Sequence, residues 1–220
     1  MADLQPAELE ALARFVYESG QLKRAKRAGW WLAGIKDPET IAEHSFRTAL
    51  IGYMLAVMEG ANPERVATLC LFHDTQETRV GDIPSVGHQY LAAAPNTAVT
   101  EDQISGSPEV VMQAVRELVE EYEDRDSLES LVAHDADKLE CLFQAREYQA
   151  QGYPDVPPWI ETSAAGLRTE SGRQLAEAAQ QVPPKQWWKT FVENFGRHRR
   201  GTPGSDLPSR QAHPDAKPRS

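Results

Sequence analysis

The stretch LCLFHDTQE, from Leu69 to Glu77, constrains the chain more than any other, because an apolar helix face runs into charged side chains there. Val66, Leu69 and Cys70 are followed by His73 and Glu77 at spacings that share one face of a helix. Burying an imidazole or a carboxylate without a partner costs several kcal/mol. The pattern therefore predicts that these groups face a metal ion, a hydrogen-bond partner or a solvent-filled cleft.

The remaining polar groups of such a site have to come from other parts of the chain. Asp74 lies about 100° around the helix from His73, so both side chains reach one ion only if other helices complete the site. A predicted helix over residues 40–59 carries His44 in an apolar stripe. A lone histidine on such a stripe is more often a hydrogen-bonded core residue, and it is the downstream pair that makes His44 a candidate ligand.

A third predicted helix, over residues 128–148, contains two candidate aspartates. Asp135 falls on its apolar stripe, and Asp137 falls on the opposite side with Cys141. If the helix is buried on both sides, either aspartate could complete the site, and spacing alone leaves both open. Two imidazoles and two carboxylates suit one divalent ion (Mn²⁺, Co²⁺, Fe²⁺ or Mg²⁺) better than they suit a closed thiolate zinc site. An open site of this kind favours phosphate ester hydrolysis by a metal-bound water.

The composition limits the class of partner. The chain has 220 residues, a formal net charge of −10 and a pI near 5.1, which argues against binding a nucleic-acid polymer through its phosphates. No apolar run approaches the length of a membrane span and the first residues lack a signal-peptide core, so we expect no membrane association and a cytoplasmic location. The two cysteines, Cys70 and Cys141, are expected to be reduced thiols in helices.

No segment shows the alternation typical of strands, so the sequence predicts an all-α fold. Residues 92–108 are rich in Ala, Pro, Asn, Thr, Ser and Gly, and we interpret them as a loop or lid. The aromatic residues Trp187, Trp188, Phe191 and Phe195 are interpreted as core or dimer packing. Further helices are predicted over residues 6–19, 63 to about 81, 110–122, 161–181 and 184–196.

A basic run from Lys23 to Arg27 directly precedes Trp30 in this acidic chain. One interpretation is a solvated loop with the tryptophan in the core, which is typical of charge runs. The other is a clamp for an anion beside a flat aromatic wall. Asp82, in the segment Gly-Asp-Ile-Pro, is likewise either a turn aspartate or a residue that lines the cleft.

The order of these motifs resembles that of the HD-domain metal-dependent phosphohydrolases, and within them the 5′-deoxynucleotidase branch. The matching segments are Arg27–Trp30, Pro38–Ser45, His73-Asp74-x-x-Glu77, Gly81–Ile83, Asp137-Lys138 and Gln144–Tyr148. The resemblance implies a single compact helical bundle with a central metal site over residues 10–196. A short segment, 1–9, would precede it and a disordered tail, 197–220, would follow. It also implies a homodimer that acts on a small nucleoside monophosphate.

The same resemblance assigns roles residue by residue. It leaves Asp135 either as a residue that supports the metal ligands or as helix packing. It gives Glu77 the task of orienting or deprotonating the attacking water, or of passing a proton to the departing 5′-oxygen. It places Asp82 against the sugar with a share in that proton transfer, and Trp30 as a wall against the deoxyribose. The implied ligands of one divalent ion are His44, His73, Asp74 and Asp137.

One position departs from the bacterial members of this branch, in which an arginine directly precedes the tryptophan. Here the position is Gly29, so either Arg27 or Lys26 reaches the phosphate, or monophosphate selectivity is relaxed. The expected activity is hydrolysis of deoxynucleoside 5′-monophosphates. The alternatives are a phosphatase for an unusual nucleotide or sugar phosphate, a cyclic-nucleotide phosphodiesterase, and a non-catalytic helical module stabilised by metal.

Overall fold

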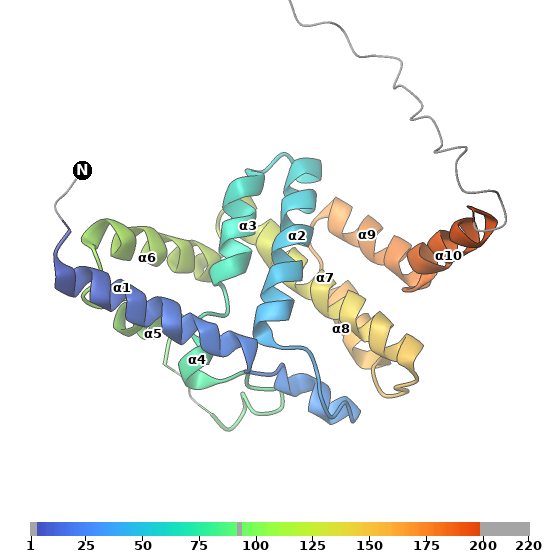
Figure 1. Cartoon of the computed structure of the whole chain (residues 1–220), viewed down its shortest axis with the longest axis horizontal. Coiled ribbons are helices and arrows are strands. Elements are labelled where there is room, and N and C mark those ends of the chain that lie inside the picture. The colour runs from blue at the N-terminus through green and yellow to red at the C-terminus, as the bar shows by residue number, and fades with distance from the viewer. Residues whose placement is uncertain (1–3, 92–93, 199–220) are drawn as a thin grey trace, which may run out of the picture. The chain divides into compact units, whose positions relative to one another are not determined.

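The computed structural model describes residues 4–91 and 94–198, and its helices can be followed in Figure 1. Over these residues there is no strand, only an isolated bridge between Lys26 and Thr40. The prediction of an all-α fold is therefore confirmed. The helices are α1 (Pro6–Ser19), η1 (Gly20–Lys23), η2 (Ala28–Ala33), α2 (Ile41–Glu59), α3 (Pro63–Phe72), α4 (Glu77–Val80), α5 (Asn96–Ile104), α6 (Glu109–Asp124), α7 (Leu128–Gln151), α8 (Pro157–Ala165), α9 (Glu170–Gln181) and α10 (Gln186–His198).

The chain divides into two compact units, one ending at Val182 and one beginning at Pro183. The second unit contains α10, where Trp187, Trp188 and Phe191 are at least half exposed. Of the two alternatives for these three residues, core packing is therefore wrong and dimer packing stays a prediction. The side chain of Phe195 and residues 199–220 lie outside the described part. The predicted domain boundaries stay a prediction. No helix among the described residues has the length and apolar character needed to cross a membrane.

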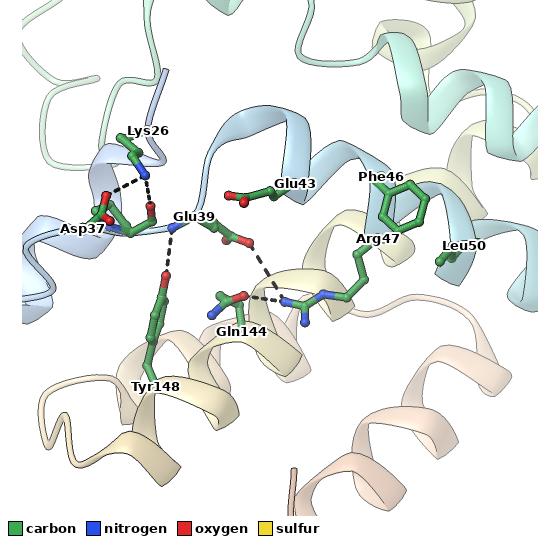
Figure 2. Close-up of a pocket in the computed structure, with 10 residues that line it drawn as sticks. Lys26, Asp37, Glu39, Glu43, Phe46, Arg47, Leu50, Gln144 and Tyr148 are labelled. Carbon is green, nitrogen blue, oxygen red and sulfur yellow. Dashed lines mark hydrogen bonds and ion pairs between the residues drawn. The ribbon is translucent and has the colours of Figure 1, made fainter. Parts of the chain in front are cut away.

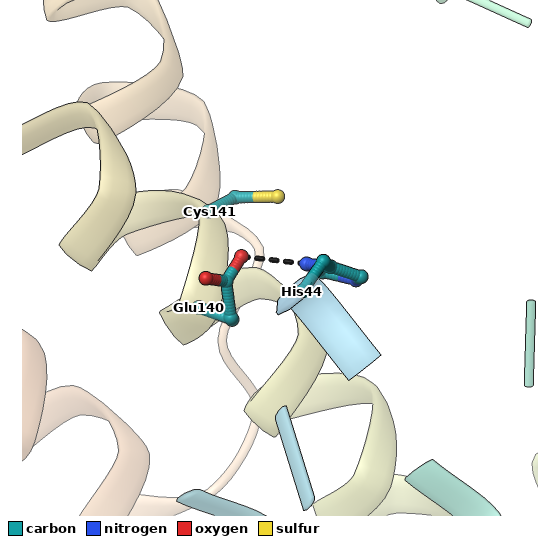
Figure 3. A group of neighbouring side chains, drawn as sticks. All are labelled: His44, Glu140 and Cys141. Carbon is teal, nitrogen blue, oxygen red and sulfur yellow. Dashed lines mark hydrogen bonds and ion pairs between the residues drawn. The ribbon is translucent and has the colours of Figure 1, made fainter. Parts of the chain in front are cut away.

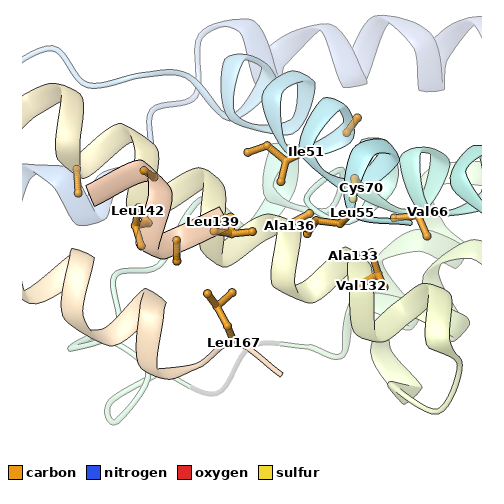
Figure 4. Packing of buried hydrophobic residues seen from close by; sticks show 14 of the residues in the cluster. Ile51, Leu55, Val66, Cys70, Val132, Ala133, Ala136, Leu139, Leu142 and Leu167 are labelled. Atoms are coloured by element: carbon orange, nitrogen blue, oxygen red, sulfur yellow. The ribbon is translucent and has the colours of Figure 1, made fainter. Parts of the chain in front are cut away.

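The core of the first unit lies where α2 and α3 pack against α7, as Figure 4 shows. Gly52 allows α2 and α3 to approach closely, because a Cβ atom there would lie 2.8 Å from Cys70 Sγ and 3.0 Å from Val66 Cγ1. This close contact fixes the three helices that carry the candidate site. The labelled core side chains are Ile51, Leu55, Val66, Cys70, Val132, Ala133, Ala136, Leu139, Leu142 and Leu167.

Local signals start these helices where the sequence predicts. The Thr40 hydroxyl accepts from the Glu43 backbone N–H at 3.2 Å, and the Glu43 carboxylate accepts from the Thr40 N–H at 2.7 Å. This reciprocal pair begins α2 and sets His44 in its first turn. The side chains of Asn62 and Ser127 accept backbone N–H groups at the starts of α3 and α7.

Three predicted elements differ from the structure. The helix expected from 63 to about 81 is interrupted, with α3 ending at Phe72 and α4 beginning at Glu77. The segment 92–108, interpreted as a loop, contains α5, whose Val99 and Ile104 are buried. The helix expected over 161–181 is divided into α8 and α9. For α5, the helix is stabilised by tertiary packing and not by a local sequence pattern.

Candidate active site

Four polar side chains meet between α2, the end of α3 and α7. His44 Nε2 lies 3.4 Å from His73 Nε2 and 3.1 Å from Asp137 Oδ1. His73 Nε2 lies 3.1 Å from Asp74 Oδ2, and the two remaining nitrogen–oxygen distances are 3.7 and 3.9 Å. The structure therefore brings together the two histidines and the two aspartates that the sequence singled out.

The interruption after α3 shapes this cluster. The backbone N–H groups of Thr75, Glu77, Thr78 and Arg79 bond to carbonyls three residues earlier, so the turn is tighter than an α-helix. With about three residues per turn, positions i and i+3 lie one above the other. Asp74 and Glu77 therefore share a face, whereas the sequence predicted a shared face for His73 and Glu77.

Hydrogen bonds at the far ring nitrogens orient both imidazoles. His73 Nδ1 lies 2.7 Å from the Cys70 carbonyl oxygen, which only accepts, so Nδ1 carries a proton and Nε2 is the nitrogen that holds the lone pair in the neutral ring. His44 Nδ1 lies 2.6 Å from Glu140, as Figure 3 shows, and Arg47 donates to the same carboxylate. Both Nε2 atoms thus face the cluster, an orientation that favours metal ligation.

The two aspartates of α7 lie in different surroundings. Asp137 Oδ1 is in the cluster, and the side chain is 28% exposed. Asp135 is fully buried and accepts hydrogen bonds from the backbone N–H groups of Arg168 and Thr169 and from the Thr169 hydroxyl. Asp135 therefore holds the segment that leads into α9, and it is outside the cluster.

The donor set fits a single divalent ion. Ligands about 2.1 Å from an octahedral ion lie roughly 3.0 Å apart when adjacent and 4.2 Å apart when opposite. The nitrogen–oxygen distances given above, from 3.1 to 3.9 Å, fall within this range. His44, His73 and Asp137 offer ligand atoms that all lie within 4.8 Å of one another, whereas Asp74 is close to both histidines but is outside that group. A second group, His44 with Glu140 and Cys141, is also close enough in space, but Arg47 occupies Glu140 and Arg27 donates to Cys141.

Arg27 is the cation nearest the cluster among the described residues. Its Nη1 atom lies 3.3 Å from Asp74 Oδ2 and 4.0 Å from Asp82 Oδ1. Burial opposes the charge of Asp74, but His73 and Arg27 outweigh it and lower the pKa of this carboxyl to about 2. Lys26 points elsewhere, since its ammonium bonds Asp37 and the Pro38 carbonyl.

The pKa of Glu77 is shifted in the opposite direction to that of Asp74. Burial, with the neighbouring charges of Asp74 and Asp82, raises the pKa of Glu77 to about 9. Its buried Oε2 atom has no hydrogen-bond partner among the described residues. A carboxyl that is protonated at neutral pH beside ionised carboxylates is the usual arrangement of a general acid.

A family model described as an HD domain matches residues 19–181. The chain belongs to the HD-domain family. It is 33% identical over 149 residues to the 5′-deoxynucleotidase HDDC2 of Homo sapiens, with 63% of this chain and 69% of the relative covered. The corresponding mouse protein is 34% identical over 148 residues, with 63% and 70% covered.

A solved structure extends the likeness to the fold. A conserved hypothetical protein from Pyrococcus furiosus has a TM-score of 0.61 and 27% identity to this chain. The alignment covers 76% of this chain and 98% of that one. The resemblance on which the sequence analysis relied is therefore confirmed at the level of the family.

Two adjoining cavities open beside the cluster of this HD domain. One, of about 280 Å³, is lined by His73, Asp74 and Glu77, and also by His88 from the segment after α4. The other, of about 200 Å³, is lined by Trp30, Gly29 and Trp159. Arg27 and Asp82 line both cavities, which therefore adjoin at these two residues.

Trp30 lines this space but is only 2% exposed. Its Nε1 donates to Glu39 at 2.9 Å, and its ring packs against Tyr148 and Trp159. An aromatic wall therefore includes Trp159, which the sequence analysis missed. The only sequence signal was its position after a proline break, far from the other motifs.

The largest of the described cavities, about 480 Å³, lies on another side of α2 (Figure 2). Its polar side chains bond one another: Arg47 bonds Gln144 and lies 4.0 Å from Glu39, and Tyr148 bonds the Glu39 backbone. Because Arg47 also holds Glu140, this network supports the orientation of His44. Neither Glu140 nor Arg47 was singled out from the sequence.

Proposed function

We propose that this HD domain is a divalent-metal-dependent 5′-nucleotidase that hydrolyses deoxynucleoside 5′-monophosphates to a deoxynucleoside and phosphate. The observation that carries the proposal is the cluster of two imidazoles and two carboxylates, with Arg27 and the buried Glu77 carboxyl beside it. The relatives named 5′-deoxynucleotidase support the choice of substrate.

In this proposal one divalent ion is held by His44, His73, Asp74 and Asp137. The imidazole and carboxylate donors favour Mn²⁺, Co²⁺, Fe²⁺ or Mg²⁺, and the described residues offer no thiolate to the cluster. When bound, the ion polarises a phosphoryl oxygen and lowers the pKa of a water molecule. Glu140 and the Cys70 carbonyl fix the two imidazole rings for this task.

Arg27 is assigned to the substrate phosphate, because its guanidinium lies beside Asp74 and Asp82 at the border of the cavity and matches the oxygens of a phosphate. Lys26, the other cation considered, is directed toward Asp37 and receives no such role. The departure at Gly29 is thus compensated by an arginine two positions earlier.

Glu77 is assigned to proton donation toward the departing 5′-oxygen. The pKa of about 9 favours this role over removal of a proton from water, because the carboxyl holds its proton at neutral pH. Asp82 borders the same space and is assigned to the sugar, with a share in the proton transfer. Trp30 and Trp159 are assigned to the wall beside the sugar.

We also propose that the protein acts as a cytoplasmic homodimer. All the exposed residues of α2 between positions 46 and 58 are apolar, and such a patch is typical of an interface. Both cysteines are free, as in a reducing compartment. Analytical ultracentrifugation measures the oligomeric state. The exposed side chains are Phe46, Leu50, Tyr53, Met54, Val57 and Met58.

The test is phosphate release from a panel of deoxy- and ribonucleoside 5′-monophosphates after chelation and return of each ion separately. We expect metal-dependent release that favours the deoxy substrates. Nucleoside 3′-monophosphates and cyclic nucleotides serve as the matched controls. Metal-loaded protein that releases no phosphate from any 5′-monophosphate would reject the proposal, and release from the cyclic substrates alone would replace it with a phosphodiesterase.

A further inference from the structure

A separate cavity of about 210 Å³ lies against another face of α7. It shares no lining residue with the two cavities beside Arg27, as far as the described residues show. It is therefore distinct from the candidate active site. The residues that line it are Arg125, Leu131, His134, Asp135, Lys138, Gly166 and Arg168.

Three cations border this small space in a chain whose net charge is −10. Arg125, Lys138 and Arg168 form no ion pair with the described residues, unlike most of the arginines of the first unit. The single acid of the lining, Asp135, directs both oxygens at the backbone of Arg168 and Thr169. The charged residues that line the cavity are therefore three cations and one carboxylate.

Lys138 is held in place at the cavity. Its ammonium donates to the His134 carbonyl at 3.2 Å, and a Cβ atom on Gly166 would lie 2.9 Å from both Lys138 Cδ and Cε. The absence of a side chain at Gly166 thus leaves room for the lysine stem. An alanine at this position would displace the stem that presents the charge.

His134 adds an acceptor to these donors. The side chain is 8% exposed, and its Nε2 lies 2.8 Å from the Tyr122 carbonyl oxygen, so the proton is on Nε2. Burial lowers the pKa of His134 to about 4, which leaves the ring neutral at physiological pH. Its Nδ1 carries a lone pair and makes no hydrogen bond with the described residues. The cavity therefore combines three cationic donors with one buried acceptor.

We propose that this cavity binds a protonated oxyanion of the phosphate class, with a P–O–H group donating to His134 Nδ1 and the other oxygens accepting from Lys138, Arg168 and Arg125. The acceptor is the feature that selects the ligand, because hydrogen phosphate can donate to it and sulfate cannot. The volume is below the 300 Å³ or so of ordinary small-molecule sites, which favours inorganic phosphate over a whole nucleotide.

The experiment is a titration of the full-length, Mg²⁺-loaded protein, uniformly labelled with ¹⁵N, followed through its backbone amide resonances. Inorganic phosphate should shift the amides of Arg125 and of residues 166–169 in a saturable way. Binding at the active site would be recorded separately, at Asp74 and Glu77. Sulfate should bind at residues 166–169 at least about tenfold more weakly, the ratio expected for one missing hydrogen bond to a buried acceptor.

Two sets of variants test the assignment. The double variant Lys138→Gln/Arg168→Gln should bind phosphate at least about tenfold more weakly. The matched control is Arg14→Gln, which removes an exposed charge from α1 and should change nothing. His134→Leu removes the acceptor, and the Tyr122 carbonyl keeps the Ser130 hydroxyl as a donor, so phosphate binding should fall to the level of sulfate.

The outcomes that would overturn the inference are equally specific. Equal affinity for phosphate and sulfate in the parent protein would remove the role of His134. Unchanged phosphate binding in the double variant, or shifts that grow linearly without saturation, would remove the site. A nucleoside 5′-phosphonate, which is not hydrolysed, separates two sources of the ligand. If the phosphonate shifts the amide resonances of residues 166–169 and free phosphate does not, the size argument for inorganic phosphate is wrong.

Discussion

Asp135 and Asp137 stand on the same helix and differ in what they do there. Asp135 is fully buried, and backbone N–H groups from the segment before α9 saturate its oxygens. Asp137 is partly exposed and faces two imidazoles instead of the backbone. A carboxylate that is satisfied by the fold contributes to stability, whereas one that faces other side chains with ligand atoms is available for chemistry. The predictions below test this division.

Replacing Asp137 should have the largest effect on catalysis. Asp137→Asn removes one negative charge from the cluster, so the ion is lost and activity falls on the order of 10³-fold or more. Burial opposes its ionisation, yet His44, His73 and Arg27 hold the pKa of Asp137 well below its usual range, so the charge is present throughout the physiological range. Metal content by elemental analysis and phosphate release are the two measurements. An active variant without metal would remove Asp137 from the ligand set.

Replacing Glu77 should separate catalysis from metal binding. Glu77→Gln keeps the shape of the side chain and loses the transferable proton, so the rate should fall by about 10²-fold or more while the metal content stays constant. Asp82→Asn, in the same cavity, is a comparison variant with a smaller expected loss.

The pH dependence adds a second readout for Glu77. Because its pKa is raised to about 9, the carboxyl is protonated at neutral pH and loses its proton as the pH rises. Activity should therefore decline on the alkaline side, at or below pH 9, since a bound cation lowers the pKa of a nearby carboxyl. Glu77→Gln should lack this decline. A rate that is independent of pH up to 10 in the parent enzyme would contradict proton donation by Glu77.

The Glu140 carboxylate is expected to act through His44. Glu140→Gln should weaken metal binding by about 10- to 100-fold, the usual effect of removing a partner of a ligating imidazole. Arg47 also pairs with Glu147, which is 38% exposed and is not a partner of His44. Glu147→Gln is therefore the matched control and should leave metal affinity unchanged. If both variants lost the same metal affinity, the effect would come from Arg47, the shared partner, and not from Glu140.

The sequence predicted the ligand-bearing helices well because each has an apolar stripe and a start signal of its own. Thr40 with Glu43 begins α2, and Asn62 begins α3. The division between α3 and α4 could not be predicted. It depends on local bonds that compete with the helix, such as the Thr75 hydroxyl donating to the Phe72 carbonyl and His73 Nδ1 bonding Cys70.

The choice between Asp135 and Asp137 was also beyond a periodicity argument. α7 is buried on more than one side, so its apolar stripe does not tell which side faces the cluster. Which aspartate faces the cluster depends on Thr169, a residue far along the chain, because its backbone N–H donates a hydrogen bond to Asp135. Trp159 was missed for the same reason, because only the tertiary fold brings it beside Trp30.

Replacing Asp135 should have the smallest effect on catalysis and a clear effect on stability. In Asp135→Asn, an NH₂ group replaces an oxygen that accepts hydrogen bonds from two backbone N–H groups and a hydroxyl. About 2 kcal/mol of unfolding free energy should therefore be lost. Urea denaturation measures this loss, and metal content and turnover per folded molecule should match those of the parent protein. Asp137→Asn should show the reverse for the metal, which should be lost together with turnover. If Asp135→Asn lost metal as readily as Asp137→Asn, the two aspartates would form one network through α7, and the division between fold and chemistry would fail.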